Sequence, residues 1–197
     1  MSAAQRREQL LDVTTALVIG QGFHGVSMEA VSRAAGVTRA LVYQHFDDLG
    51  DLLNAVVARE MDRALSQVTE TQLTNLGEGE PRELMLESLR AFLFAVRDHP
   101  TTWRLVLMPP EGAPPAMRRS VARARTRVRA GMAESVQPAL RAGRGPAEAR
   151  LTANVLSAVA DEYARMVLTD PRRYPPERLL EHARWLLEHP AAGGGHE

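Results

Sequence analysis

The stretch AAGVTRALVYQHF, from Ala34 to Phe46, decides how the N-terminal part of this chain folds. Gly36 is the residue type that ends a helix in the left-handed conformation, where a side chain would clash with the backbone. Thr38 follows two residues later and is a typical N-cap, so a new helix is expected from there to about Phe46. The stretch therefore predicts two short helices joined by a tight turn.

The residues upstream predict the partner of that helix and the helix that supports both. Ser27, with Glu29 close behind it, is a typical N-cap followed by an acidic first turn, and this second helix is expected to end at Gly36. An earlier helix, ended by the glycines at 20 and 22, is indicated by apolar residues at helical spacing, which are Leu10, Val13, Leu17 and Val18.

The rest of the chain also has helical periodicity. A long helix capped by Asp47 or Asp48 is expected next, with apolar positions continuing to Leu65. Prolines and glycines then divide the sequence into further expected helices, which cover about 84–96, 102–107, 115–140, 146–168 and 177–188. No alternating strand pattern occurs, so we expect an all-α fold of about nine helices.

Composition excludes several classes of protein. The chain has no cysteine, which excludes disulfides and thiolate metal sites. No pair of histidines has metal-ligand spacing, and neither a glycine-rich phosphate loop nor a Gly-x-Ser-x-Gly motif is present. We therefore expect no metal, no cofactor and no enzymatic activity. Without a secretory leader or a long apolar run, the protein is expected to be cytoplasmic and not bound to a membrane.

The second short helix carries side chains suited to DNA. With Leu41 and Val42 directed inward, Arg39 can donate to guanine and Ala40 can approach a thymine methyl group. Hydroxyl, imidazole and amide groups nearby can donate to phosphates or base edges. The complete set of expected DNA-binding residues is Ser27, Thr38, Arg39, Ala40, Tyr43, Gln44 and His45.

The run from Phe23 to Leu53 resembles the DNA-binding segment of the tetracycline-repressor (TetR) family. The matching residues are Gly22-Phe23, Ser27, Val31, Ala35-Gly36-Val37-Thr38, Leu41-Val42-Tyr43-Gln44-His45-Phe46 and Leu52-Leu53. Two positions depart from the family pattern, since Leu49 stands where a phosphate-binding lysine is usual and Ser32 where alanine is common.

This resemblance implies a homodimeric transcriptional regulator, expected to be a repressor that a small-molecule ligand releases from a palindromic double-stranded operator. The expected domains are a three-helix helix-turn-helix domain at residues 1–48 and a helical ligand-binding and dimerisation domain at 49–190. A disordered tail is expected at 191–197. Residues 1–60 hold five arginines and seven acidic residues, so we expect modest, salt-sensitive DNA affinity that also uses Arg6 and Arg7.

The C-terminal half is less specific. Adaptable methionine and aromatic side chains are candidates for a ligand pocket, although each also fits an ordinary core. The ligand candidates are Phe92, Trp103, Met108, Met132, Tyr163 and Met166. Apolar residues on the last two helices are candidates for the dimer interface, namely Leu151, Val155, Val159, Leu179, Trp185 and Leu186.

One alternative remains open at this point. The low charge of the N-terminal helices would also suit a helical adaptor that binds protein. A small-molecule-binding protein that does not bind DNA is compatible with the same composition.

Overall fold

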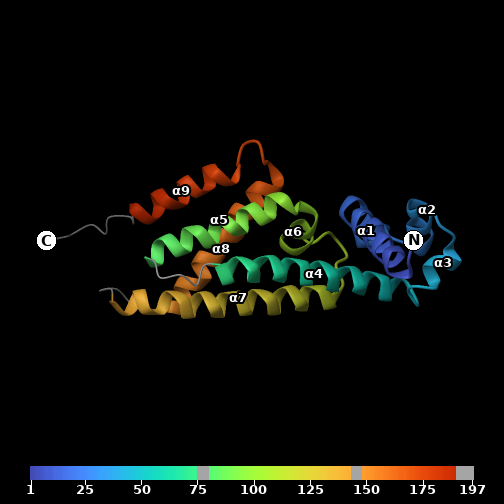
Figure 1. Cartoon of the computed structure of the whole chain (residues 1–197), viewed down its shortest axis with the longest axis horizontal. Helices are drawn as coiled ribbons and strands as arrows, with labels where there is room; N and C mark the ends of the chain where they lie inside the picture. Colours follow the sequence, from blue (N-terminus) through green and yellow to red (C-terminus); the bar gives the residue numbers. More distant parts are fainter. Residues whose placement is uncertain (75–79, 143–147, 190–197) are drawn as a thin grey trace. The chain divides into compact units, whose positions relative to one another are not determined.

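The structure, a computed structural model, describes residues 1–74, 80–142 and 148–189 (Figure 1). These residues form nine α-helices and one short 3-10 helix, and they contain no strand, which confirms the expected all-α fold. The helices are α1 (Ala3–Gln21), α2 (Met28–Ala35), α3 (Arg39–Tyr43), α4 (Leu49–Thr74), α5 (Pro81–Asp98), α6 (Pro100–Leu107), α7 (Pro115–Ala142), α8 (Ala149–Thr169) and α9 (Pro176–Glu188), with η1 at Phe23–Gly25. The expected tail at 191–197 lies outside the described residues.

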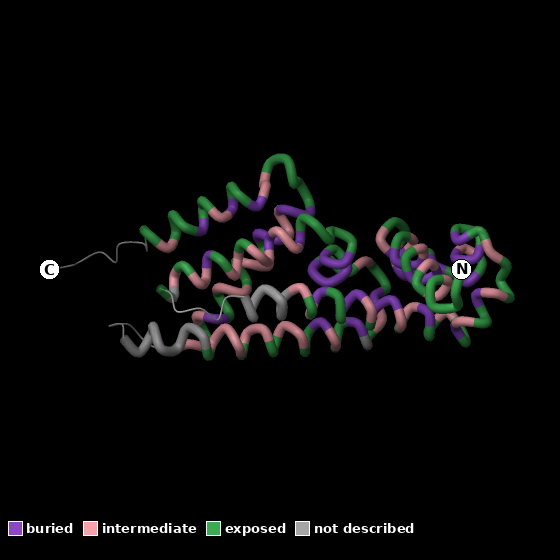
Figure 2. The backbone as a smooth tube through the Cα atoms, in the orientation of Figure 1, coloured by how far each residue is buried: buried purple, intermediate pink, exposed green. Residues whose placement is uncertain are grey.

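The chain divides into two compact units. The first comprises Met1–Ser66 with Thr101–Thr126, and the second comprises Gln67–Pro100 with Arg127–Glu197. In the first unit, α1, α2, α3 and the start of α4 enclose an apolar core (Figure 2). Its fully buried side chains include Leu10, Val18, Val31, Val42, Phe46, Leu52 and Val56. This core fixes α2 and α3 against the longer helices.

Local hydrogen bonds explain where the longer helices begin. Ser2 Oγ accepts from Gln5 N–H, and the Gln5 side chain accepts in return from Ser2 N–H, so a capping box starts α1. Of the two residues expected to cap α4, Asp48 does so, because its Oδ1 accepts from Asp51 N–H at 2.8 Å. Asp51 Oδ2 accepts in turn from Asp47 N–H at 3.2 Å.

A cluster of charges joins α1 to α4 and explains much of the acidic excess in the N-terminal sequence. The Arg59 guanidinium lies 3.0 Å from Glu8, 2.8 Å from Asp12 and 2.8 Å from Glu60. Glu60, only 1% exposed, also accepts from Thr102 Oγ1 at 2.5 Å. Burial lowers the pKa of Arg59, but the hydrogen bond to Glu8 and the neighbouring carboxylates outweigh it, so the pKa is raised overall. These acids are therefore engaged away from α3.

In the second unit, α5 packs against both α8 and α9. The Tyr163 hydroxyl on α8 lies 2.7 Å from His182 Nδ1 on α9, and burial raises the pKa of that phenol, which keeps it protonated. Ion pairs between Arg82 and Glu188 and between Arg97 and Glu177 join α5 to α9. Within the described ranges, no helix is both long enough and apolar enough to cross a membrane.

Candidate nucleic-acid interface

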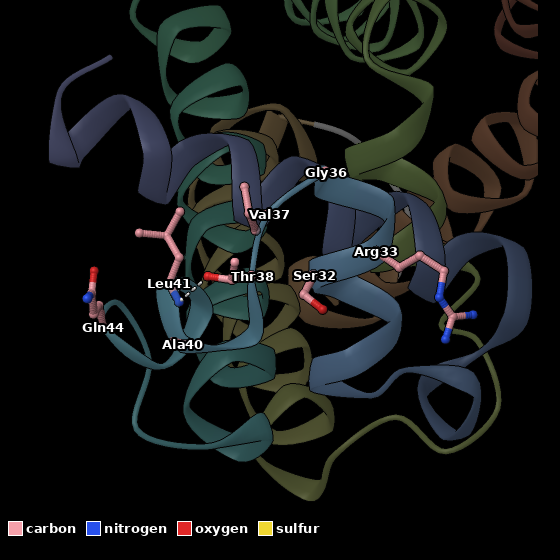
Figure 3. A pocket seen from close by; sticks show the side chains of 8 residues that line it. All are labelled: Ser32, Arg33, Gly36, Val37, Thr38, Ala40, Leu41 and Gln44. Carbon is pink, nitrogen blue, oxygen red and sulfur yellow. Dashed lines mark hydrogen bonds between the residues drawn. The ribbon is translucent and has the colours of Figure 1, made fainter.

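The two short helices form a bent corner, residues 27–46, whose ends are fixed by local hydrogen bonds (Figure 3). Ser27 Oγ accepts from Ala30 N–H at 3.1 Å, and Thr38 Oγ1 accepts from Leu41 N–H at 3.3 Å, so both predicted N-caps are confirmed. Gly36 adopts the left-handed conformation at φ 66° and ψ 36°. Val37 N–H donates back to Ser32 O at 2.9 Å, which completes the turn between the helices.

The corner displays the predicted DNA-binding side chains on its surface. Tyr43 is 46% exposed, whereas Val42 beside it is 0% exposed and anchors α3 in the core. His45 is half-buried. The other predicted residues, all exposed, are Ser27, Thr38, Arg39, Ala40 and Gln44. Six of the seven predicted residues are thus exposed, while their binding to DNA stays a prediction.

Two details of α3 differ from the sequence-based expectation. The helix ends at Tyr43 and not near Phe46, because the chain turns there to bury the Phe46 ring in the core. Leu41 and Val42 were both expected to face inward; Leu41 is half-buried, whereas Val42 is fully buried. A helix of five residues has room for one buried anchor, and Val42 occupies it.

Leu41 lines a shallow depression of about 490 Å³ on the corner (Figure 3). Val37 and Ala40 supply further apolar surface to it, while Arg33 and Gln44 supply polar groups. The depression is formed entirely by α2, the turn and the segment that holds α3. It therefore belongs to the same surface as the predicted DNA-binding residues.

Arg7 has a structural role that the sequence did not reveal. Its Nη1 donates to His45 O at 2.7 Å, and its guanidinium lies 4.3 Å from the centre of the Phe46 ring. Both contacts join α1 to the residues just after α3. Nothing in the local sequence pattern links residues so far apart, so only the fold could reveal this contact.

The two arginines of the corner differ in whether they pair with an acidic side chain. Arg33 pairs with Glu29 at 2.6 Å along α2, although both side chains are exposed. Within the described part of the chain, no acidic side chain pairs with Arg39. Ser32, which replaces the usual alanine, is buried and satisfied, because its hydroxyl donates to Glu29 O at 2.9 Å. Arg39 is therefore the cation on α3 that is available to an anionic partner.

The candidate ligand residues have varied environments. Trp103 and Tyr163 are buried, and Met108 is 40% exposed. Phe92, Met132 and Met166 are half-buried. Two of the six, Trp103 and Met108, belong to the first compact unit, and the other four belong to the second. A ligand pocket built from them stays a prediction.

Five of the six candidate dimer residues lie on the surface. They form what we call the α8–α9 face, which consists of Leu151, Val155, Val159, Trp185 and Leu186. Val155 is 55% exposed and Trp185 is 53% exposed, which is unusual for such apolar side chains. The sixth candidate, Leu179, is buried within its own chain and does not belong to this face.

Comparison with known proteins agrees with this geometry. Residues 10–56 match the family model described as bacterial regulatory proteins, tetR family. The transcriptional activator FasR of Mycolicibacterium smegmatis is 28% identical over 102 residues, which is 52% of this chain and 45% of FasR. The chain spans less than half the length of the curated relatives that it matches first.

Solved structures extend the similarity in fold to nearly the whole chain. A TetR-like regulator from Rhodococcus sp. RHA1 superposes with a TM-score of 0.78 at 22% identity, covering 98% of this chain and 100% of that one. AibR, solved with isovaleryl coenzyme A and operator DNA, has a TM-score of 0.72 at 17% identity, covering 92% and 97%. The helix-turn-helix corner and the family match show that residues 10–56 are similar to the DNA-binding segment of the tetR family of bacterial regulatory proteins, and the solved structures show that the whole chain shares the fold of TetR-like regulators.

Proposed function

We propose that this chain is a cytoplasmic transcriptional regulator that binds a palindromic operator as a homodimer. The observation that carries the proposal is the exposure of Arg39, Tyr43 and Gln44 on a short helix at a helix-turn-helix corner. Such a helix fits the major groove of B-DNA, where arginine and glutamine side chains can bond to base edges. The match of residues 10–56 to a family of regulatory proteins supports the same function.

Binding by a dimer would double the contacts and set the spacing of the half-sites. Two copies related by a two-fold axis would present their α3 helices to major grooves about 34–36 Å apart. The exposed α8–α9 face supports such a dimer, because apolar surface on two neighbouring helices is stabilised when a second copy covers it. The functional division that we propose places DNA binding in residues 1–48 and ligand binding and dimerisation in 49–190.

Regulation would come from a small molecule bound by the C-terminal helices. Such a ligand releases DNA only if it binds more tightly to a dimer geometry whose α3 helices no longer match the groove spacing. AibR, similar in fold, was solved with both isovaleryl coenzyme A and operator DNA, which supports a fold that can bind a small molecule as well as DNA. We propose repression as the default outcome, since a protein bound over a promoter blocks it until the ligand arrives.

The function can be tested with the protein and the DNA upstream of its own gene. We expect a labelled duplex from that region to be retarded in a gel, and an excess of the same unlabelled duplex to compete better than scrambled DNA. Binding should weaken steeply as salt rises, because each phosphate contact releases counterions. If scrambled DNA competes equally well, the proposed function is wrong, and a helical adaptor or a ligand-binding protein without DNA becomes the better explanation.

A further inference from the structure

We infer that the depression on the α2–α3 corner receives the C5-methyl group of a thymine, and that Leu41 is the side chain that reads it. The inference rests on the proposed DNA-binding function, and it specifies a base-edge feature that this function leaves open. Leu41 would then be a specificity-determining residue, in addition to the polar residues expected from the sequence.

The position of Leu41 is the first observation that supports this role. Its backbone is fixed, because its N–H donates to Thr38 Oγ1 at 3.3 Å at the start of α3. Its neighbour Val42 is fully buried, so α3 already has its anchor in the core. Leu41 is half-buried, so part of its side chain reaches the surface, and packing within this chain does not account for that part.

The surroundings of Leu41 are the second observation. Val37 and Ala40 line the same depression, so three apolar side chains lie together beside exposed Thr38 and Gln44, which line it too. Figure 3 shows the Leu41 and Gln44 side chains on the same short segment. An apolar patch enclosed by groups suited to DNA is continuous with the proposed interface, and a major groove that covers the polar groups would also cover this patch.

The chemistry of the major groove then selects the occupant. All four bases present hydrogen-bond donors or acceptors there, but only thymine presents a methyl group. An aliphatic side chain pressed against a donor or acceptor would leave that group without its hydrogen bond, which is unfavourable. Contact between Leu41 and a methyl group instead removes apolar surface from water on both sides.

The experiment removes the methyl group without changing base pairing. Duplexes that bind the wild-type protein are first enriched from a random pool, and each thymine of an enriched duplex is then replaced by deoxyuridine, symmetrically in both half-sites. Burying one methyl group corresponds to about a fourfold change in affinity per half-site. We therefore expect fluorescence anisotropy to show this loss at one thymine position and little change at the others.

Variants of the protein assign the effect to Leu41. Leu41→Ala shortens the side chain, and Leu41→Gln replaces it with a polar side chain that is larger than alanine. Both variants should bind the thymine duplex more weakly and no longer distinguish thymine from deoxyuridine. Arg39→Ala is the matched control, since it should lose affinity and keep the full deoxyuridine penalty. Thermal melting of each variant checks that the corner remains folded, and agreement between the two Leu41 variants separates a lost contact from a local distortion.

The possible failures are distinguishable. If the wild-type protein enriches a duplex but tolerates deoxyuridine at every position, the inference is wrong and the DNA-binding function stands. The same conclusion follows if Leu41→Ala keeps the penalty, because another side chain then reads the methyl group. If no duplex is enriched at all, the proposed function fails, and this inference fails with it.

Discussion

At the scale of single residues, Gly36 holds the corner through its backbone conformation. It has a φ of 66°, and an added Cβ would meet no atom within 4 Å, so a larger residue would suffer from its backbone conformation and not from crowding. We expect Gly36→Ala to lower the free energy of unfolding by about 1–2 kcal/mol. Gly20, in the last turn of α1 and equally open, is the matched control, and Gly20→Ala should raise it by up to about 1 kcal/mol. Urea unfolding measures both, and equal effects would contradict this explanation.

Arg39 and Tyr43 should differ in what they contribute to DNA binding. Arg39 has no acidic partner in the described residues and can contact a base, so Arg39→Ala should cost about 1–3 kcal/mol and relax the preference at one position. Tyr43 can donate its hydroxyl to a phosphate, so Tyr43→Phe should weaken binding evenly across sequences. Affinities for the operator and for its single-base variants measure the difference. A uniform loss with Arg39→Ala would place Arg39 on the phosphate backbone instead.

The sequence predicted single residues well wherever the signal was local. The caps at Ser27, Thr38 and Asp48 and the turn at Gly36 depend on hydrogen bonds or conformations within a few residues. Leu41 is half-buried and Val42 fully buried, a difference that a pattern of two adjacent apolar residues does not indicate. The contact of Arg7 with residues 45 and 46 was missed because it spans 38 positions and depends on how α1 crosses α3.

At the scale of elements, the loop between α6 and α7 contacts the turn between α1 and α2. Phe23 N–H donates to Glu111 O at 3.1 Å, and Gly112, at φ 77°, lies directly under the His24 ring. A Cβ at Gly112 would come within 2.5 Å of that ring. The positive φ favours glycine at position 112, and the hydrogen bond from Phe23 fixes the loop to η1.

We expect Gly112→Ala to destabilise the protein by about 1–3 kcal/mol, since it combines an unfavourable φ with a steric clash. The double variant His24→Ala/Gly112→Ala removes the clash but not the backbone penalty, so it should recover part of the loss. Thermal unfolding of the two single variants and the double variant measures this coupling. If the stability loss of the double variant equals the sum of the losses of the two single variants, the His24 ring moves aside without cost.

The packing of the helices also shows why the net charge of the N-terminal residues is a poor guide to DNA binding. The net charge of the N-terminal residues argued against DNA binding, but the sum includes acids that serve other helices. Glu8, Asp12 and Glu60 hold Arg59 between α1 and α4, Asp48 caps α4, and Asp51 accepts from Asp47 N–H in front of it. A charge count cannot separate such structural acids from those on a binding surface, because the separation depends on which helix faces pack together.

At the scale of the whole molecule, helix periodicity cannot tell a chain's own core from its interface with a partner. Leu179 and Leu186 are both apolar residues of α9, yet Leu179 is buried and Leu186 is exposed. The pattern of apolar residues was therefore sufficient to predict that α9 has a buried side. It was not sufficient to separate residues that pack within one protomer from those left for a second copy, since this depends on how α5 packs against α8 and α9.

The α8–α9 face leads to a prediction about assembly. If a second copy covers Val155, an arginine there would bring two unpaired charges into an apolar interface, which is strongly unfavourable. We expect Val155→Arg to remain folded and to weaken dimerisation at least about tenfold, equivalent to 1.4 kcal/mol or more. Sedimentation at micromolar concentration should then change from dimer to monomer, and binding to a two-half-site operator should weaken because each complex loses one of its two corners. Met108→Arg is the control, since Met108 is also exposed and apolar but lies outside this face. If both variants sediment as the wild-type protein does, the dimer uses another surface.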